Sequence, residues 1–237
     1  LLSRRQRQMC IRDSDKRLRA SALVESGDTR ILIDCGPDFR QQMVGLDFKR
    51  IDAVLLTHVH YDHVGGLDDL RPFCVFGEIK IYADESTACR LKQSISYCFG
   101  EHTYPGVPKI SLNVVKPHEH FTVGGIDIMP VRVMHDKLPI LGYRIGDLLY
   151  ITDMKTIDDG EFKYFSGVKT LVVNALRFKK EHHSHLTAEQ ALAFADKVGA
   201  QQTFFTHMGH DIGLHEETNR ILPDNVKLAY DGQVVMV

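Results

Sequence analysis

Four side chains of metal-ligand type lie within six positions of the segment AVLLTHVHYDHVGGLDDL. They are His58, His60, Asp62 and His63, and they follow an apolar run typical of a buried strand. Because residues two apart in an extended chain point the same way, His58 and His60 can bind one ion together. Asp62 and His63 are adjacent where the chain turns, so they can face a second ion. Imidazole and carboxylate are ligands that zinc accepts, so this spacing predicts a metal site rather than a loop of idle histidines.

Three more candidate ligands occupy equivalent places further along the chain. His135 ends the strand-like DIMPVRVMH, Asp153 ends LLYITD, and His207 ends QTFFTH. When several strands end in ligand residues, these residues lie together at one edge of a sheet, where loops commonly carry binding and catalytic residues. Together with the first four residues they make up a set large enough for a two-metal site.

Two cations about 3.5–4 Å apart would lower the pKa of a bridging water, so that hydroxide forms near neutral pH. They would also neutralise the negative charge that develops on the substrate. This chemistry suits hydrolysis of phosphodiesters, thioesters or amides, so the ligands predict a reaction type and not a substrate. A proton donor for the leaving group is also needed. His185, in HHSHLTAEQA, is the candidate, although its context alone favours a solvated loop histidine.

The elements that must position these residues are short strands separated by turn signals and interrupted by helices. SALVES and TRILIDCG predict a hairpin joined through Gly27-Asp28. Helical spacing follows Asp84, and Thr187-Ala-Glu-Gln190 is a capping box for a helix that stops at Gly199. Gly65-Gly66 would let the backbone bend sharply beneath the first ligands. The remaining candidate strands are DAVLLTH, IKIYA, SLNVV, IDIMPVRVMH, LGYRIG, LLYITD, TLVVNAL, QTFFTH and VKLAY.

This pattern predicts one continuous domain with mixed sheets and helices outside, of class α/β or α+β. The 237 residues carry a net charge of −2, with 43% hydrophobic and 25% charged residues, which is ordinary globular composition.

No apolar run approaches the roughly 18–20 residues that span a bilayer. The near-neutral charge of the chain gives no bulk electrostatic attraction for nucleic acid. The five cysteines are scattered without a Cys-x-x-Cys pair, which argues against a disulfide framework and predicts a cytoplasmic location.

THVHYDHVGG resembles the His-x-His-x-Asp-His signature of the metallo-β-lactamase fold superfamily, and the resemblance covers about residues 20–237. It implies a four-layer αβ/βα sandwich of two mixed β-sheets with helices outside. The family pattern would place His58, His60 and His135 on one ion, and Asp62, His63 and His207 on the other. Asp153 would bridge both ions, while Asp34 in ILIDCG would support the ligand loop by hydrogen bonds. The implied cofactors are two divalent metal ions, with zinc (Zn2+) first and manganese (Mn2+) as the alternative.

A finer resemblance points to the PhnP-like branch, which contains the cyclic phosphodiesterase of phosphonate utilisation. The matching segments are KRLRASALVE, ILIDCGPDFRQQM, THVHYDHVGGLDDLRPF, LGYRIG and THMGHDIGLH. SHLTAEQAL resembles the phosphodiesterase motif whose histidine contacts the phosphate and protonates the leaving oxygen, which assigns that role to His185. His182 and His183 match less well and are expected to be surface residues. His185 and Asp62 are therefore the candidate catalytic residues.

The resemblance implies a metal-dependent phosphoric diester hydrolase that acts on a small, cyclic phosphodiester through a metal-bridging hydroxide. The first alternative is a nuclease or RNA-processing enzyme of the same superfamily. Residues 64–134 lack the long glycine-rich, basic arm expected of a transfer-RNA processing enzyme, so nucleic acid is not the favoured partner. A thioester or lactam hydrolase ranks next, and a metal-binding protein without catalysis last. No membrane partner is expected, and relatives suggest a homodimer.

Residues 1–14, LLSRRQRQMCIRDS, do not resemble the family and are expected to be a non-native or disordered leader before a single domain over 15–237. Relatives in this branch begin with a glycine-rich strand and a Cys-x-Cys-x-x-Cys cluster, which binds a separate structural zinc together with a histidine. The corresponding histidine here is His210, but the leader offers only Cys10. A structural zinc needs four protein ligands, so we expect two catalytic metals and no third.

Overall fold

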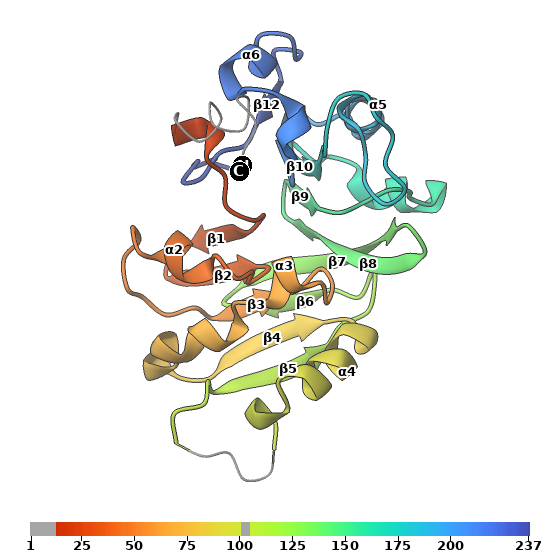
Figure 1. The fold of residues 1–237 in the computed structure, drawn as a ribbon. Coiled ribbons are helices and arrows are strands. Elements are labelled where there is room, and N and C mark those ends of the chain that lie inside the picture. Colours follow the sequence, from red (N-terminus) through yellow and green to blue (C-terminus); the bar gives the residue numbers. More distant parts are fainter. Residues whose placement is uncertain (1–12, 101–104) are drawn as a thin grey trace. The chain divides into compact units, whose positions relative to one another are not determined.

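The computed structural model describes residues 13–100 and 105–237, which form two compact units (Figure 1). One unit is Arg19–Pro130. The other is Val131–Val237 together with the described residues up to Leu18. The first four predicted ligands lie in Arg19–Pro130 and the three later ones lie in Val131–Val237, so each unit positions its own part of the ligand set.

The unit Arg19–Pro130 is built on a five-stranded mixed sheet of order β1-β2-β3-β4-β5. The strands are β1 (Ala22–Ser26), β2 (Thr29–Ile33), β3 (Ala53–Leu55), β4 (Ile79–Ala83) and β5 (Ile110–Val114). β1 and β2 form the antiparallel hairpin that the sequence predicts, and the other neighbours pair in parallel. β3 is the middle strand of this sheet and is buried at every residue. The ligands that follow β3 therefore leave the sheet from a firmly packed position.

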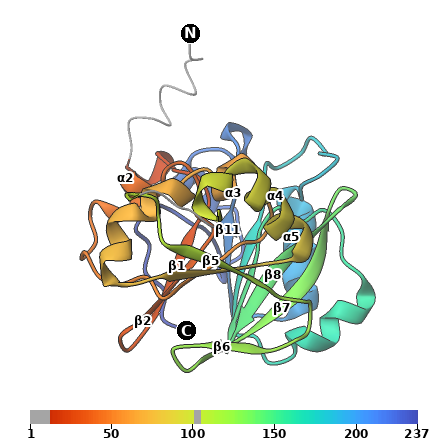
Figure 2. The ribbon, with the colours of Figure 1, turned by 90° about the horizontal axis from the view of Figure 1, so that it is seen from below.

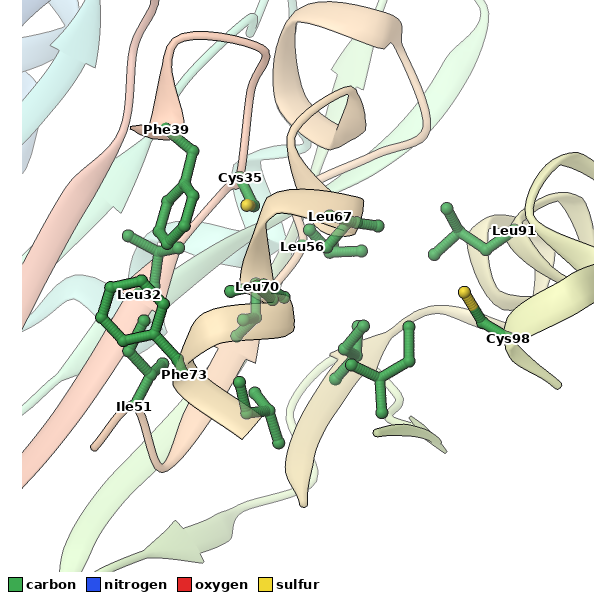
Figure 3. Close-up of a cluster of buried hydrophobic side chains, with 14 of the residues drawn as sticks. Leu32, Cys35, Phe39, Ile51, Leu56, Leu67, Leu70, Phe73, Leu91 and Cys98 are labelled. Carbon is green, nitrogen blue, oxygen red and sulfur yellow. The ribbon is translucent and has the colours of Figure 1, made fainter. Parts of the chain in front are cut away.

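Helical segments connect these strands and cover one face of the sheet. They are α2 (Phe39–Met43), α3 (Tyr61–Val64), the 3-10 segment η2 (Leu67–Phe76), α4 (Glu85–Ser94) and the 3-10 turn η3 (Ser96–Cys98). Figure 2 shows α2 and α4 on the same side of the strands. Their apolar side chains form one core with the sheet, in which the rings of Phe39 and Phe73 lie 5.6 Å apart beside Leu32 and Leu70 (Figure 3). The predicted helix after Asp84 exists, but its α-helical part ends at Ser94.

A seven-stranded mixed sheet of order β12-β11-β10-β9-β8-β7-β6 contains the strands of the unit Val131–Val237. Its strands are β6 (Phe121–Val123), β7 (Ile126–His135), β8 (Leu138–Ile145), β9 (Leu148–Ile151), β10 (Thr170–Asn174), β11 (Gln202–Thr206) and β12 (Val226–Leu228). From β9 to β12 every neighbouring pair is parallel, whereas β8 and β9 are antiparallel. Because parallel strands end at the same edge of a sheet, the residues after β9 and β11 reach one rim.

Helix α5 (Ala188–Val198) carries the predicted capping box. The Thr187 hydroxyl accepts from the backbone N–H of Gln190, and the Gln190 side chain accepts from the N–H of Thr187. Gly199 ends the helix at a left-handed φ of 73°, as its position predicts. Phe194 packs against Phe162 of the 3-10 segment η4 (Asp159–Phe165), with ring centroids 5.7 Å apart. The cap fixes the start of α5 shortly after His185, and the apolar contact packs the helix against η4.

The described residues before Arg19 are bound to the C-terminal part of the chain. Asp15, in the 3-10 turn η1 (Asp13–Asp15), accepts the backbone N–H of His215 at 2.7 Å. The Arg17 Nε donates to the carbonyl oxygen of Ala229 at 3.0 Å. His215 opens α6 (His215–Asn219), which follows the turn η5 (His210–Ile212). Cys10 and residues 1–12 of the expected leader lie outside the described residues.

Two mixed sheets with accompanying helices confirm the predicted fold class. Every strand that the sequence predicts is present, and among the strands of the described residues only the three-residue β6 was not predicted. Within residues 13–100 and 105–237, no helix has the length and apolar character needed to cross a membrane.

Candidate metal centre

The first ligand cluster, defined as His58, His60, Asp62 and His63, lies on the loop and short helix that follow β3. His58 and His63 are buried, Asp62 is half buried, and His60 is exposed as the N-cap of α3. The Nε2 atom of His58 lies 2.9 Å from Nδ1 of His60. The Nε2 atom of His63 lies 3.3 Å from Oδ2 of Asp62. These are the two pairs that the sequence spacing predicts.

The buried carboxylate of Asp34 orients this cluster. It accepts hydrogen bonds from Nδ1 of His63 at 2.7 Å and from the backbone N–H of Thr57 at 2.8 Å. The Thr57 hydroxyl donates its one proton to Asp34 at 2.9 Å, so it accepts from Nδ1 of His58 at 3.0 Å. Both histidines therefore carry their proton on Nδ1, which leaves the Nε2 lone pair for a metal ion. These bonds confirm the supporting role expected of Asp34.

Gly36 and Gly66 allow two backbone segments to pass very close together beneath the cluster. A Cβ atom on Gly66 would lie 2.1 Å from the carbonyl oxygen of Gly36, and one on Gly36 would lie 2.2 Å from that of Asp62. Gly65 and Gly66 have φ angles of −64° and −98°, which other residues also adopt. The prediction that Gly65-Gly66 supplies a sharp bend is therefore wrong. What Gly66 supplies is space for the neighbouring backbone.

The second ligand cluster, defined as His135, Asp153 and His207, lies at the ends of three strands. His135 is the last residue of β7, Asp153 comes two residues after the end of β9, and His207 directly follows β11. Asp153 and His207 have left-handed backbones, with φ angles of 56° and 51°. That conformation costs a non-glycine residue about 1–2 kcal/mol and is typical of functional sites. The side chains of these two residues are in close contact, with His207 Nε2 3.0 Å from Asp153 Oδ1.

Two backbone carbonyls orient His135. Its Nδ1 atom lies 2.7 Å from the carbonyl oxygen of Asp153 and 3.0 Å from that of Ser184. Because a carbonyl oxygen only accepts, Nδ1 carries the proton and Nε2 has the lone pair. Ser184 is buried on the loop before α5, so this bond ties that loop to the second ligand cluster.

His185 lies against the second ligand cluster. Its ring stacks on His207, with centroids 4.9 Å apart and planes at 15°, and meets His135 edge-on at 4.8 Å. Its Nε2 atom lies 3.7 Å from Oδ1 of Asp153. Burial lowers the pKa of His185 to about 3, which Asp153 opposes and the imidazoles of His207 and His135 reinforce. His185 is therefore a neutral, enclosed side chain beside candidate ligands and not a solvated loop histidine.

The neighbouring histidines His182 and His183 differ from each other. His183 is exposed, as the sequence predicts. His182 is half buried, and its Nδ1 atom lies 3.1 Å from Nδ1 of His185. The sequence carries a weak signal of this contact, since His182 and His185 are three residues apart in the run HHSH. Nothing in the residue pattern singled out Thr57 or Ser184, whose roles depend on the tertiary contacts described above.

The donor groups fit divalent cations. A tetrahedral ion with bonds to nitrogen of about 2.0–2.1 Å places neighbouring donors about 3.3 Å apart. The three donor pairs lie at 2.9, 3.3 and 3.0 Å. The Nδ1 atoms of His63 and His135 are held by a carboxylate and by carbonyls, which is how metal-binding imidazoles are usually supported. Histidine and aspartate together suit zinc or a similar borderline ion.

Comparison with known proteins decides the family. A family profile described as the "Beta-lactamase superfamily domain" matches residues 29–208. The crystal structure of "a New Diphosphatase from the PhnP Family" is 37% identical, with a TM-score of 0.86, and the match covers 95% of this chain and 87% of that one. The chain belongs to the PhnP family of the β-lactamase superfamily. It therefore has the metallo-β-lactamase fold, and the predicted superfamily, branch and fold are confirmed.

Two curated relatives add to this picture of the PhnP-family chain. Ribonuclease Z of Bradyrhizobium diazoefficiens is 27% identical over 94% of this chain and 95% of its own length. A protein named octanoyltransferase from Porphyromonas gingivalis is 43% identical over 92% of this chain. The chain spans only 44% of the length of that octanoyltransferase.

Proposed function

We propose that this chain is a dinuclear metal-dependent phosphodiesterase that hydrolyses a small phosphodiester, cyclic ones included. The observation that carries the proposal is the position of His185. Its ring stacks on His207, and its Nε2 atom lies 3.7 Å from Asp153. A side chain able to donate a proton thus lies beside two candidate metal ligands. The leaving oxygen of a phosphodiester bound there would need such a proton.

We assign one ion to His58, His60 and His135, the other to Asp62, His63 and His207, and Asp153 to both. Support comes from the donor spacing within each ligand cluster and from the Nδ1 protonation of the buried rings. Two bound divalent ions would supply an activated water and offset negative charge on the phosphate. Zinc is the first choice and manganese the second. Asp62 counts as a catalytic residue in this assignment because it would hold one of these ions at the reacting phosphate.

The proton donor has to be charged when the leaving oxygen departs. Without substrate, burial keeps His185 neutral near pH 7, since its pKa is about 3. A phosphodiester anion beside the ring would raise that pKa, because a nearby negative charge favours the protonated form. His185 would then pass the proton on Nε2 to the leaving oxygen, and the loss of charge would return it to its neutral form.

A substrate panel tests the proposal. Purified protein loaded with zinc or manganese is assayed with bis(4-nitrophenyl) phosphate, a ribosyl cyclic phosphate, a nucleoside diphosphate compound, an octanoyl thioester and nitrocefin. The nucleoside diphosphate is included because one relative is described as a diphosphatase. The thioester is included because another relative is named octanoyltransferase. We expect hydrolysis of phosphodiesters. Turnover of the thioester or nitrocefin alone would contradict the proposal.

An RNA-processing nuclease is the second candidate, because ribonuclease Z matches this chain over nearly its whole length. Filter binding of transfer RNA at two salt concentrations separates the two functions, since a nuclease needs phosphate contacts that weaken steeply with salt. A small-molecule enzyme should show no tight, salt-sensitive binding. The homodimer, the cytoplasmic location and the absence of a third metal stay predictions.

A further inference from the structure

His182 contacts the proposed proton donor through a single ring nitrogen. It lies on the loop between β10 and α5, three residues before His185. Its Nδ1 atom lies 3.1 Å from Nδ1 of His185, 3.3 Å from the backbone nitrogen of Ser184 and 3.2 Å from the Ser184 hydroxyl oxygen. Three polar groups therefore converge on one nitrogen, and the chemistry of the three decides where its proton can be.

The direction of these hydrogen bonds follows from the Ser184 backbone. An amide N–H only donates, so Nδ1 of His182 must present its lone pair. Two lone pairs facing each other at 3.1 Å would repel, so the proton in the contact between the rings belongs to Nδ1 of His185. The Ser184 hydroxyl oxygen, 3.0 Å from Nδ1 of His185, can accept from that same proton. The single lone pair of His182 Nδ1 is therefore shared by the N–H groups of Ser184 and His185.

We propose that His182 is a positioning residue that keeps the proton of neutral His185 on Nδ1, so that Nε2 is the atom that serves the substrate. The inference rests on the proposed function of His185 as proton donor. In its charged form, His185 keeps the Nδ1 proton bonded to His182 and gives the Nε2 proton to the leaving oxygen. What remains is the neutral tautomer that His182 already favours, so the ring needs no rearrangement between turnovers.

The orientation of the His185 ring between Asp153 and His182 agrees with this role. Nε2 of His185 is the nitrogen near Asp153, at 3.7 Å, while Nδ1 faces His182. Arg177 holds the loop that carries His182, since its guanidinium donates to the carbonyl oxygens of Lys180 and Glu181 at 2.6 and 3.1 Å. An imidazole partner orients His185 without adding the negative charge that a carboxylate would bring to the second ligand cluster.

The environment of His182 keeps its lone pair available. Burial lowers the pKa of His182, and His183 and Arg177 lower it further. A neutral His182 can accept a hydrogen bond, which a charged one cannot. Arg177, in the same loop, and Lys155, outside it, are cations that oppose protonation of the ring.

Two substitutions at one position separate hydrogen-bond acceptance from packing. His182→Asn places an acceptor oxygen near the position of Nδ1, whereas His182→Leu has similar bulk and no acceptor. His183→Leu is the matched control, since it removes the exposed neighbouring imidazole. Each zinc-loaded protein is assayed with bis(4-nitrophenyl) phosphate, which has a good leaving group, and with a ribosyl 2′,3′-cyclic phosphate, whose alkoxide leaving group needs a proton.

We expect His182→Leu to lower kcat for the cyclic phosphate about 10–100-fold, part of the 10²–10⁴-fold that a general acid supplies. The change for the nitrophenyl ester should stay within about threefold, because nitrophenolate needs little protonation. KM and zinc content should not change, and His182→Asn and His183→Leu should stay near wild type. Equal losses for Asn and Leu, or for both substrates, would overturn the proposal.

Nitrogen-15 NMR of the histidine rings gives a readout that does not depend on turnover. The His185 signals are identified by their loss in His185→Ala. Zinc-loaded wild type and His182→Asn should show His185 protonated on Nδ1, and His182→Leu should shift the proton toward Nε2. A wild-type His185 with its proton on Nε2 would overturn the inference. If the Nδ1 form is found but no phosphodiester is hydrolysed, the proposed function fails while the hydrogen-bond assignment stands.

Discussion

Replacing Asp34 by asparagine should disconnect His63 from its support without disturbing the shape of the loop. Asparagine is isosteric with aspartate and tolerates the left-handed backbone, which has a φ of 59° at this residue. Its amide oxygen can still accept from the N–H of Thr57, which Asp34 binds at 2.8 Å. The amide nitrogen would then replace the oxygen that accepts from Nδ1 of His63 at 2.7 Å. Two donors cannot pair, so the imidazole proton should move to Nε2, where a metal ion needs the lone pair.

The size of this effect follows from the contact that is lost. Removing a carboxylate that supports a metal-binding histidine typically costs about 10–100-fold in metal affinity. Each factor of ten is about 1.4 kcal/mol, so the ion at His63 should bind more weakly by about 1.4–2.8 kcal/mol. Folding should be affected as well, because a buried hydrogen bond to a charged group is worth about 1.5–3 kcal/mol.

Zinc affinity is measured by competition with a chromogenic chelator, and the apo-protein is checked by thermal unfolding. Asp136→Asn is the matched control, since Asp136 also has a left-handed backbone, with a φ of 54°, lies next to the candidate ligand His135, and is exposed. The control should keep wild-type zinc affinity. Unchanged affinity in Asp34→Asn, with the apo-protein still folded, would refute the argument that Asp34 sets the tautomer of His63.

Other consequences of the structure can be measured separately. His185→Ala should keep both metals and lose about 10²–10⁴-fold in turnover, with a smaller loss for a nitrophenolate leaving group; an equal loss would indicate a role in substrate binding. Gly66→Ala would place a Cβ 2.1 Å from the Gly36 carbonyl and should destabilise the fold by about 1–3 kcal/mol in urea unfolding, whereas Gly45→Ala, with nothing within 4 Å, should not. Burial lowers the pKa of His215, so the unfolded chain binds its proton more readily, and stability that is present above about pH 6.5 should fall as the pH is lowered. His215→Gln should flatten that decline, and an unchanged slope would contradict the assignment.

Much of the ligand arrangement can be predicted from the sequence, because local patterns set it. The buried run of β3 comes directly before the first ligand cluster, and β7 ends at His135 as its alternation predicts. The capping box at Thr187 fixes the start of α5 and hence the place of the loop that carries His185. Each of these features depends on residues close together in the chain, which is why spacing and residue type are sufficient.

The remaining features depend on contacts between distant segments and have no local signal. Asp153 and His207 adopt left-handed backbones that their residue types do not require. Gly66 is needed for space beside Gly36, thirty positions away, and its own φ is ordinary. His182 was expected at the surface because nothing in HHSH shows which histidine turns toward His185. Such roles are visible only once the packing is known.

The bridging role of Asp153 is the central claim about the metal centre, and metal content with activity tests it most directly. Wild type and Asp153→Ala are loaded with zinc, dialysed, and analysed for zinc per chain alongside hydrolysis of bis(4-nitrophenyl) phosphate. We predict two zinc ions and activity for wild type, and fewer than two ions with no activity for Asp153→Ala, because alanine offers no oxygen to either ion. Two tightly bound ions in Asp153→Ala, or fewer than two in active wild type, would contradict the account.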